Sequence, residues 1–273
     1  MVEGRRQILS LVDPRRLLPV VGAFVGLCLV HYLTRPLEEK AWEQVRSEKP
    51  SLRQDGMFES IAQGVIPGIA GGLQNLIVDF IWIRMSQSWA EREVAETQAL
   101  IHTATALDPR PFYFWRNGAR IVAYDVPIWR IEDLAEEGIP TDADTAKAIR
   151  REHAEKGIEM LLYARQFHPE NPEVWIEIGQ IQNNLLKDRV AAALSFRRAY
   201  DMEGGPYFAG RLYAELLRRA GLPREAYRFY REMHPELPGG DPAAAKEVVL
   251  RRIRDLEAEL GIPEERRYRP GSG

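Results

Sequence analysis

Small and bulky residues recur at a fixed spacing through the middle of this 273-residue chain. In each copy a small residue is followed after four positions by a bulky one, after three more by a small one, and after five more by proline. The copies are Thr97, Ile101, Ala104 and Pro109; Gly157, Leu161, Ala164 and Pro169; and Ala192, Phe196 and Ala199, with Gly204 in place of proline. This spacing predicts antiparallel helices that cross closely at the small residues. Because no single pair of helices buries its apolar face, successive pairs must stack.

The segments around these copies extend the pattern. A tryptophan follows two of the prolines by six positions, and the second tryptophan begins a W-x-x-L-G-like core with isoleucine for leucine. The residues concerned are Trp115, then Trp175, Ile178 and Gly179. In the last unit Ala226 and Tyr230 lie 34 residues beyond Ala192 and Phe196, Ala214 is the small crossing residue, and Gly221 marks the turn. A 34-residue period is typical of one class of helix-pair repeat.

These residues resemble the tetratricopeptide-repeat (TPR) family over residues 72–235, in about four units. The run GGLQNLIVDFIWIR followed by LDPRPFYFW also resembles membrane-anchored bacterial members of that family. The resemblance implies an all-α fold: an N-terminal transmembrane helix, then a TPR-like α-solenoid of about four helix pairs with a C-terminal capping helix. It also implies that the first helix of each pair lines a concave groove.

Two units depart from the regular length. The unit at residues 172–203 carries one extra residue in its internal turn, near Lys187 and Asp188. The unit that begins near Phe112 is interrupted by residues 125–147, far longer than a usual turn between helices. This insertion contains Trp129 and Ile131, and we expect it to pack back on the repeat or to contact a partner. Thr141 or Asp142 is expected to cap the next helix, which is predicted to run to about Phe167.

The C-terminal segment, residues 236–262, predicts one further helix from Pro242 to Leu260. Its apolar residues recur at helical spacing on one face, while the other face is charged. They are Val249, Ile253, Leu256 and Leu260. Such a helix suits the open end of a stack of helix pairs. Residues 263–273 are expected to form a flexible tail.

Near the N-terminus, residues 17–33 read LLPVVGAFVGLCLVHYL and carry no Asp, Glu, Lys or Arg. As a helix this run is roughly 26 Å long, near the lower limit for crossing a bilayer. We therefore predict a transmembrane anchor at residues 17–34. A cleaved signal peptide is disfavoured because no small-residue cleavage site follows, and a lipoprotein signal because Leu27 precedes Cys28. A buried core helix is the remaining alternative.

The orientation of the anchor depends on its flanks. Positive charges tie in number on the two sides, but the short tail at residues 1–16 is rich in arginine. We expect this tail in the cytoplasm and the repeat domain on the periplasmic side of a bacterial inner membrane, after a juxtamembrane linker at residues 35–71. The apolar stretch at residues 61–83 is read as a glycine-rich loop leading into the first buried helix. The alternative, a re-entrant or membrane-lying segment, would place Asp79 near lipid at a high cost.

The charge balance and the motifs of the chain exclude several classes of function. Lys and Arg number 37 against 40 Asp and Glu, which argues against a general nucleic-acid binder. The single cysteine, Cys28, excludes an internal disulfide framework and a multi-cysteine metal site. The chain has no phosphate-loop, dinucleotide-binding, nucleophile-elbow or H-E-x-x-H motif. We therefore expect a protein that is not an enzyme and has no metal or other cofactor.

The groove implied by the resemblance predicts a binding surface. The inward positions are Tyr113, Arg116, Asn117, Arg120 and Tyr124 in one unit; Ile176, Gln180, Asn183 and Asn184 in the next; and Phe208, Arg211, Glu215 and Arg218 in the last. Arginine, amide and aromatic side chains suit an extended peptide, although they also suit a groove that is merely hydrated. We expect a membrane-anchored scaffold or accessory subunit that docks proteins within a larger membrane complex. The alternative is a peptide- or client-binding adaptor, or an assembly chaperone, that uses the groove.

Overall fold

The structure, a computed structural model, describes residues 74–271. The chain divides into two compact units, residues 1–77 and 78–273, so the described helices belong to the second unit apart from the first turn of α4. Every regular element in the described part is a helix, and the predicted all-α class is confirmed there. The elements are α4 Gln74–Ala90, α5 Val94–Leu107, α6 Phe112–Arg120, η2 Ile121–Asp125, α7 Val126–Glu136, α8 Ala143–Ala164, α9 Pro172–Ile181, η3 Gln182–Leu186, α10 Arg189–Asp201, α11 Tyr207–Arg219, α12 Pro223–Glu236, α13 Lys246–Glu259 and η4 Glu264–Arg266.

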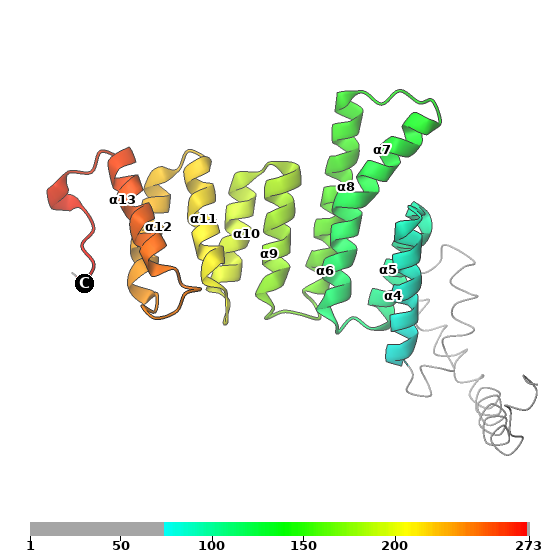
Figure 1. Cartoon of the computed structure of the whole chain (residues 1–273), viewed down its shortest axis with the longest axis horizontal. Helices are drawn as coiled ribbons and strands as arrows, with labels where there is room; N and C mark the ends of the chain where they lie inside the picture. The colour runs from blue at the N-terminus through cyan, green and yellow to red at the C-terminus, as the bar shows by residue number, and fades with distance from the viewer. Residues whose placement is uncertain (1–73, 272–273) are drawn as a thin grey trace, which may run out of the picture. The chain divides into compact units, whose positions relative to one another are not determined.

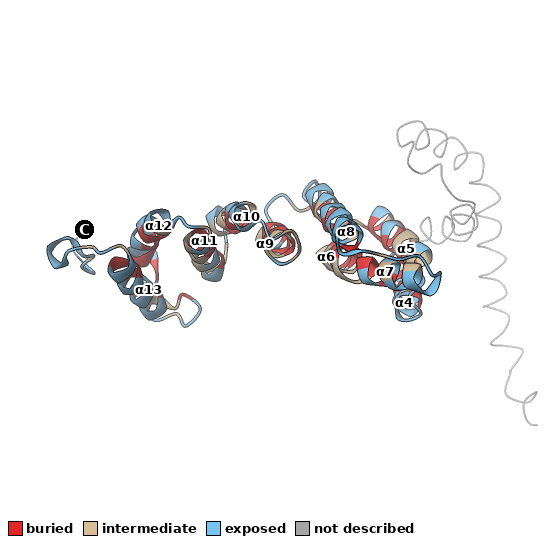
Figure 2. Cartoon of the chain, turned by 90° about the horizontal axis from the view of Figure 1, so that it is seen from above, coloured by how far each residue is buried: buried red, intermediate tan, exposed pale blue. Residues whose placement is uncertain are grey.

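From α8 onward each helix packs against the next one in the sequence, up to the contact between α12 and α13 (Figure 1). Buried residues lie on the helix sides that face a neighbour, and exposed residues lie on the outer sides (Figure 2). The core is therefore a series of apolar seams between adjacent helices.

The small residues of the repeated spacing lie at these seams, as predicted. Ala104, Ala164 and Ala199 have no exposed surface. A Cβ atom on Gly157 of α8 would lie 2.9 Å from the carbonyl oxygen of Ala119 in α6. A Cβ on Gly179 of α9 would lie 3.0 Å from the Phe196 ring of α10. The helices approach this closely because these positions carry almost no side chain.

The proline-to-tryptophan spacing also has a local cause. The indole Nε1 of Trp115 donates a hydrogen bond to the carbonyl oxygen of Pro109, at 2.8 Å. The same carbonyl oxygen lies 3.0 Å from Nε2 of His168, which is in the turn between α8 and α9. Trp115 thereby fixes the turn between α5 and α6 while its ring is buried.

The extra residue of the unit at residues 172–203 is absorbed by a π-helical turn, η3, that ends α9. A π turn holds one residue more than an α turn without breaking the helix. Lys187 then closes the turn in the left-handed conformation, with φ of 57°. The irregularity thus begins at Gln182, inside the first helix, rather than only at Lys187 and Asp188 as expected.

The predicted insertion at residues 125–147 lengthens both helices of its pair. The π turn η2 joins α6 to α7 without an intervening loop, and α8 is 22 residues long. Trp129 is buried, so the insertion packs back on the pair, while Ile131 is half-buried. Asp142 caps α8 by accepting a hydrogen bond from the Thr145 backbone, at 2.7 Å. The helix ends at Ala164, three residues before the predicted Phe167, because the chain tightens into a turn there.

The C-terminal helix begins later than predicted. Residues 242–245 form turns, and α13 starts at Lys246. Its buried residues Val249, Ile253 and Leu256 match the predicted face, and α13 packs on α12. The segment after Pro263 differs from the expected flexible tail, because the Tyr268 backbone N–H donates to Oε1 of Glu257 at 2.6 Å.

No helix within residues 74–271 has both the length and the apolarity needed to cross a membrane. The predicted tail at residues 1–16, the anchor at 17–34 and the linker at 35–71 lie outside the described residues. The described part of the apolar stretch at 61–83 is the start of α4. There Val78 and Ile81 are buried, while Phe80 and Ile83 are exposed.

His153 on α8 makes stability dependent on pH. Its ring is buried, its Nδ1 has no hydrogen-bond partner, and burial, with Lys156 nearby, lowers its pKa. The unfolded chain therefore binds a proton at a pH where the folded chain does not, and stability falls as the pH decreases below about 6.5. We expect His153→Leu to make the fall in melting temperature between pH 7 and pH 5 shallower. Equal slopes in the variant and the unaltered chain would contradict this.

Candidate protein-binding face

Two arginines predicted to line the groove are paired with carboxylates of the next helix pair. Arg120 on α6 donates two hydrogen bonds to Glu177 on α9, at 2.8 Å and 2.6 Å. One helical turn earlier, Arg116 contacts Glu173 at 3.2 Å. Both pairs span 57 residues, because arginines four apart on α6 face glutamates four apart on α9. The two ion pairs therefore join neighbouring first helices.

The environments of these two pairs differ. Glu177 is only 5% exposed, whereas Glu173 has about half of its side chain in water. The hydrogen bond from Arg120 to Glu177 is the main reason that the pKa of Arg120 is raised. The Glu177 carboxylate thus depends on Arg120 for its neutralisation, and Arg120 has little freedom to bind a carboxylate of a ligand.

The π turns place the next predicted residues together. Asn184 Nδ2 lies 3.5 Å from the Tyr124 hydroxyl, and Asn183 donates to Oδ1 of Asn184 at 2.8 Å. Burial raises the pKa of Tyr124, while the contact with Asn184 acts in the opposite direction. Gln180 is half-buried beside them on α9. The amides predicted to hold a peptide backbone lie together, and two of them already contact each other.

At the start of α6 the predicted side chains are used locally. Asn117 donates to the carbonyl oxygen of Tyr113 in its own helix, at 2.8 Å. The Tyr113 ring is half-exposed and meets Trp82 of α4 edge-on, with centroids 5.5 Å apart. This contact joins α4 to α6, and the exposed face of Tyr113 remains open to solvent.

On α11, Arg211 binds the chain that leads into α13. Its Nη1 donates to the carbonyl oxygens of Ala243 and Ala244, at 3.0 Å and 2.9 Å. Both carbonyls belong to the turn that precedes α13. Arg211 therefore holds the turn from which α13 starts.

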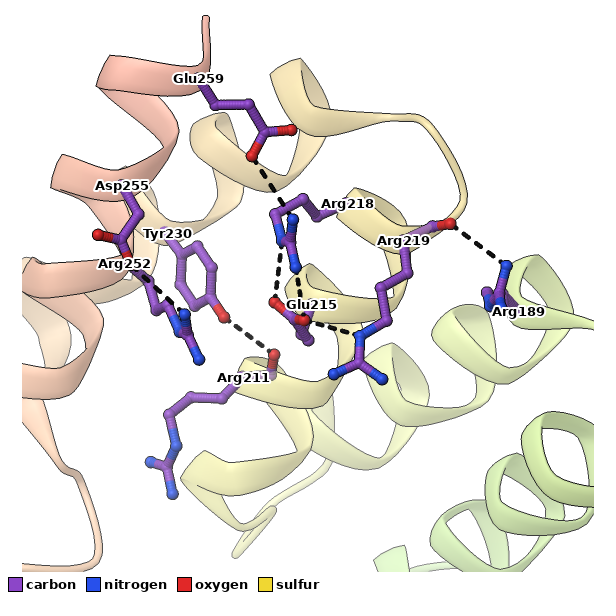
Figure 3. Close-up of polar contacts among 9 residues, drawn as sticks. All are labelled: Arg189, Arg211, Glu215, Arg218, Arg219, Tyr230, Arg252, Asp255 and Glu259. Atoms are coloured by element: carbon purple, nitrogen blue, oxygen red, sulfur yellow. Dashed lines mark hydrogen bonds and ion pairs between the residues drawn. The ribbon is translucent and has the colours of Figure 1, made fainter.

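Figure 3 shows Glu215 lying between Arg218 and Arg219 of the same helix. The hydrogen bond from Arg218 is the main cause that lowers the pKa of Glu215. Arg218 also reaches Glu259 on α13, at 3.6 Å. Nearby, the Tyr230 hydroxyl donates to the Arg211 carbonyl oxygen, and burial raises the pKa of Tyr230 to about 12. These contacts tie α11 to α12 and α13.

An open pocket of about 620 Å³ lies where α10 turns into α11. Three rings contribute to its wall, those of Tyr200, Tyr207 and Phe208. Phe208 and Leu212, one turn apart on α11, are 41% and 39% exposed. Among the predicted residues, Phe208 is thus placed, like Tyr113, to offer aromatic contact area to a partner.

The carboxylates Glu173 and Glu177 were not predicted. A signal for them was present, because their four-residue spacing matches that of Arg116 and Arg120, one unit earlier. Within the part that the structure describes, no three His, Cys, Asp or Glu side chains are placed to hold a metal ion.

A scan against models of protein families gives no match for this chain, and neither does a search of curated proteins. The relation to the TPR family therefore remains a prediction from residues and spacing.

Proposed function

We propose that this protein is a membrane-anchored TPR scaffold or accessory subunit that docks proteins within a larger membrane complex. In this proposal the pairs α4–α5, α6–α8, α9–α10 and α11–α12 form a TPR-like solenoid that α13 caps. Residues 17–34 hold it to a bacterial inner membrane with the repeat domain on the periplasmic side. Close crossings at Gly157 and Gly179 support the assignment of paired repeats.

The observation that carries the proposal is the exposed apolar surface of α11. Phe208 lines a pocket walled by rings, and Leu212 lies one turn further along the same helix. Arg211, between them, is held by the Ala243 and Ala244 carbonyl oxygens. Protein interfaces concentrate binding energy in aromatic and aliphatic side chains surrounded by polar groups. A rigid helix that offers such side chains suits a partner that also has a formed surface.

The alternative, an adaptor that captures peptides through the groove, has less support. It needs Arg116 and Arg120 to bind carboxylates of a client. Both are already paired with Glu173 and Glu177. A scaffold needs no such exchange of partners.

The test is co-purification of the full chain from detergent extract at native expression. We expect companions that elute with the chain at constant ratio, and we expect Phe208→Glu to remove at least one of them by placing a charge in the apolar contact. Leu162→Glu, at a similarly exposed leucine on α8, is the control and should keep all companions. Circular dichroism checks that both variants fold. A chain that elutes alone, or loses companions equally in both variants, contradicts the proposal.

A further inference from the structure

Three arginines on one face of α12 line a second open pocket, separate from the groove. Arg224, Arg228 and Arg231 lie four and three residues apart, so their side chains point the same way from the helix. Leu260 and Ile262, from the end of α13 and the chain beyond it, form part of the wall together with Tyr227. The pocket measures about 330 Å³. It is therefore a hollow with a basic side and an apolar side.

The positive charge of this hollow is not neutralised within residues 74–271. Arg224 and Arg228 form no ion pair or hydrogen bond there, whereas Arg116, Arg120, Arg218 and other arginines pair with carboxylates. The nearby buried carboxylate, Glu257, accepts from Arg254, from the Tyr227 hydroxyl and from the Tyr268 backbone. It is satisfied by these donors and forms no ion pair with the three arginines.

One of the three cations is held in place before any ligand binds. The guanidinium of Arg231 lies over the rings of Tyr227 and Tyr268, at 5.4 Å and 5.9 Å from their centroids. Tyr268 is fixed in turn by its backbone bond to Glu257 and by a 3.0 Å contact of its hydroxyl with Nδ1 of His234. Stacked arginine loses less freedom when it forms hydrogen bonds to an anion.

The spacing of the arginines indicates the shape of the ligand. Seven residues of helix separate Arg224 from Arg231, a rise of about 10 Å, which is too long for one phosphate or carboxylate group to bridge. In an extended peptide, alternate side chains point the same way and lie roughly 7 Å apart. Two acidic side chains of such a peptide would match the row of arginines, and the residue between them would face Leu260 and Ile262.

We propose that this hollow binds an extended acidic segment of a partner protein, in which carboxylates alternate with apolar residues. The proposal rests on the proposed function only in that the ligand belongs to a protein partner. A concave site suits a protruding segment better than the flat surface of a bilayer. Each carboxylate would receive hydrogen bonds from a guanidinium group that forms no ion pair within residues 74–271.

The test uses the purified full chain in detergent and a fluorescein-labelled peptide that alternates aspartate with leucine. Fluorescence anisotropy should show binding, and the double variant Arg224→Gln with Arg228→Gln should raise the dissociation constant by about tenfold or more. The control is Lys147→Gln with Arg150→Gln on α8, two exposed cations whose removal changes the net charge equally. The control should shift the dissociation constant by less than about twofold.

Four results of the binding measurements would overturn the proposal, and a fifth comes from competition with phosphate. The first four are no binding of the aspartate peptide, equal binding of its asparagine counterpart, equal weakening in both double variants, and stronger arginine-dependent binding to phosphatidylglycerol vesicles than to the peptide. Inorganic phosphate, added as a competitor, should displace the peptide only weakly; full displacement at low concentration would indicate a single-anion site instead. Because the assay needs no companion protein, its outcome is independent of the Phe208→Glu experiment.

Discussion

Gly157→Val is expected to lower the free energy of unfolding by about 3 kcal/mol, the upper part of the range for overpacked cores. The first added atom would already lie 2.9 Å from the Ala119 carbonyl oxygen and 2.9 Å from the Ala123 Cβ. One of these is a backbone atom, so relief requires α8 to move away from α6 and η2. The measurement is urea unfolding of the full chain, followed by circular dichroism.

The matched control is Ala148→Val, which adds a β-branched side chain at an exposed position of the same helix. Its cost should stay within about 0.7 kcal/mol, the range of helix propensity. If both variants lose the same stability, the close crossing at Gly157 is not what stabilises this pair of helices.

Arg120→Ala is expected to cost about 2 to 3 kcal/mol. Removing one partner of a buried ion pair leaves the other charge without compensation, which costs roughly 3–5 kcal/mol when both groups are buried. The value here is lower because 45% of the Arg120 side chain is exposed and water will reach the site. Adding Glu177→Gln to Arg120→Ala removes the stranded charge and should restore part of the loss.

Arg116→Ala provides the comparison within the same helix. Its partner Glu173 is 52% exposed in its side chain, and exposed ion pairs contribute about 0 to 1 kcal/mol. Urea unfolding of the unaltered chain, Arg116→Ala, Arg120→Ala and the double variant Arg120→Ala with Glu177→Gln gives the loss in free energy of unfolding for each change. A cost at Arg116 equal to that at Arg120 would contradict the difference in burial as the cause.

Much of the helical arrangement follows from the sequence, for a physical reason. Gly157, Ala192 and their equivalents must be small because the helices touch there, so the contact leaves a visible spacing in the chain. An inserted segment carries no such spacing from which its structure could be predicted. Residues 125–147 read as an interruption, yet residues 125–136 continue α6 through η2 into α7, because a π turn keeps the helix continuous.

The binding face was harder to predict. Helical spacing predicts that Arg116, Arg120 and Arg211 share one side of the repeat, but it does not predict which partners they take. Glu173 and Glu177 lie 57 residues away, and the Ala243 carbonyl lies 32 residues from Arg211. Such pairs form only when the stacking of helices brings distant turns into register. The Tyr268 contacts after Pro263 were missed for the same reason.

The link from Arg120 to Glu177 has a consequence for how the domain melts. The two partners lie in different helices, so loosening α6 leaves the buried Glu177 carboxylate of α9 without its cation. Unfolding that begins in α6 therefore tends to spread to α9, and the helix pairs on both sides of this ion pair should unfold cooperatively. A protein that grips only α11 and α12 would then protect amide hydrogens in α6 from exchange, although it never touches that helix.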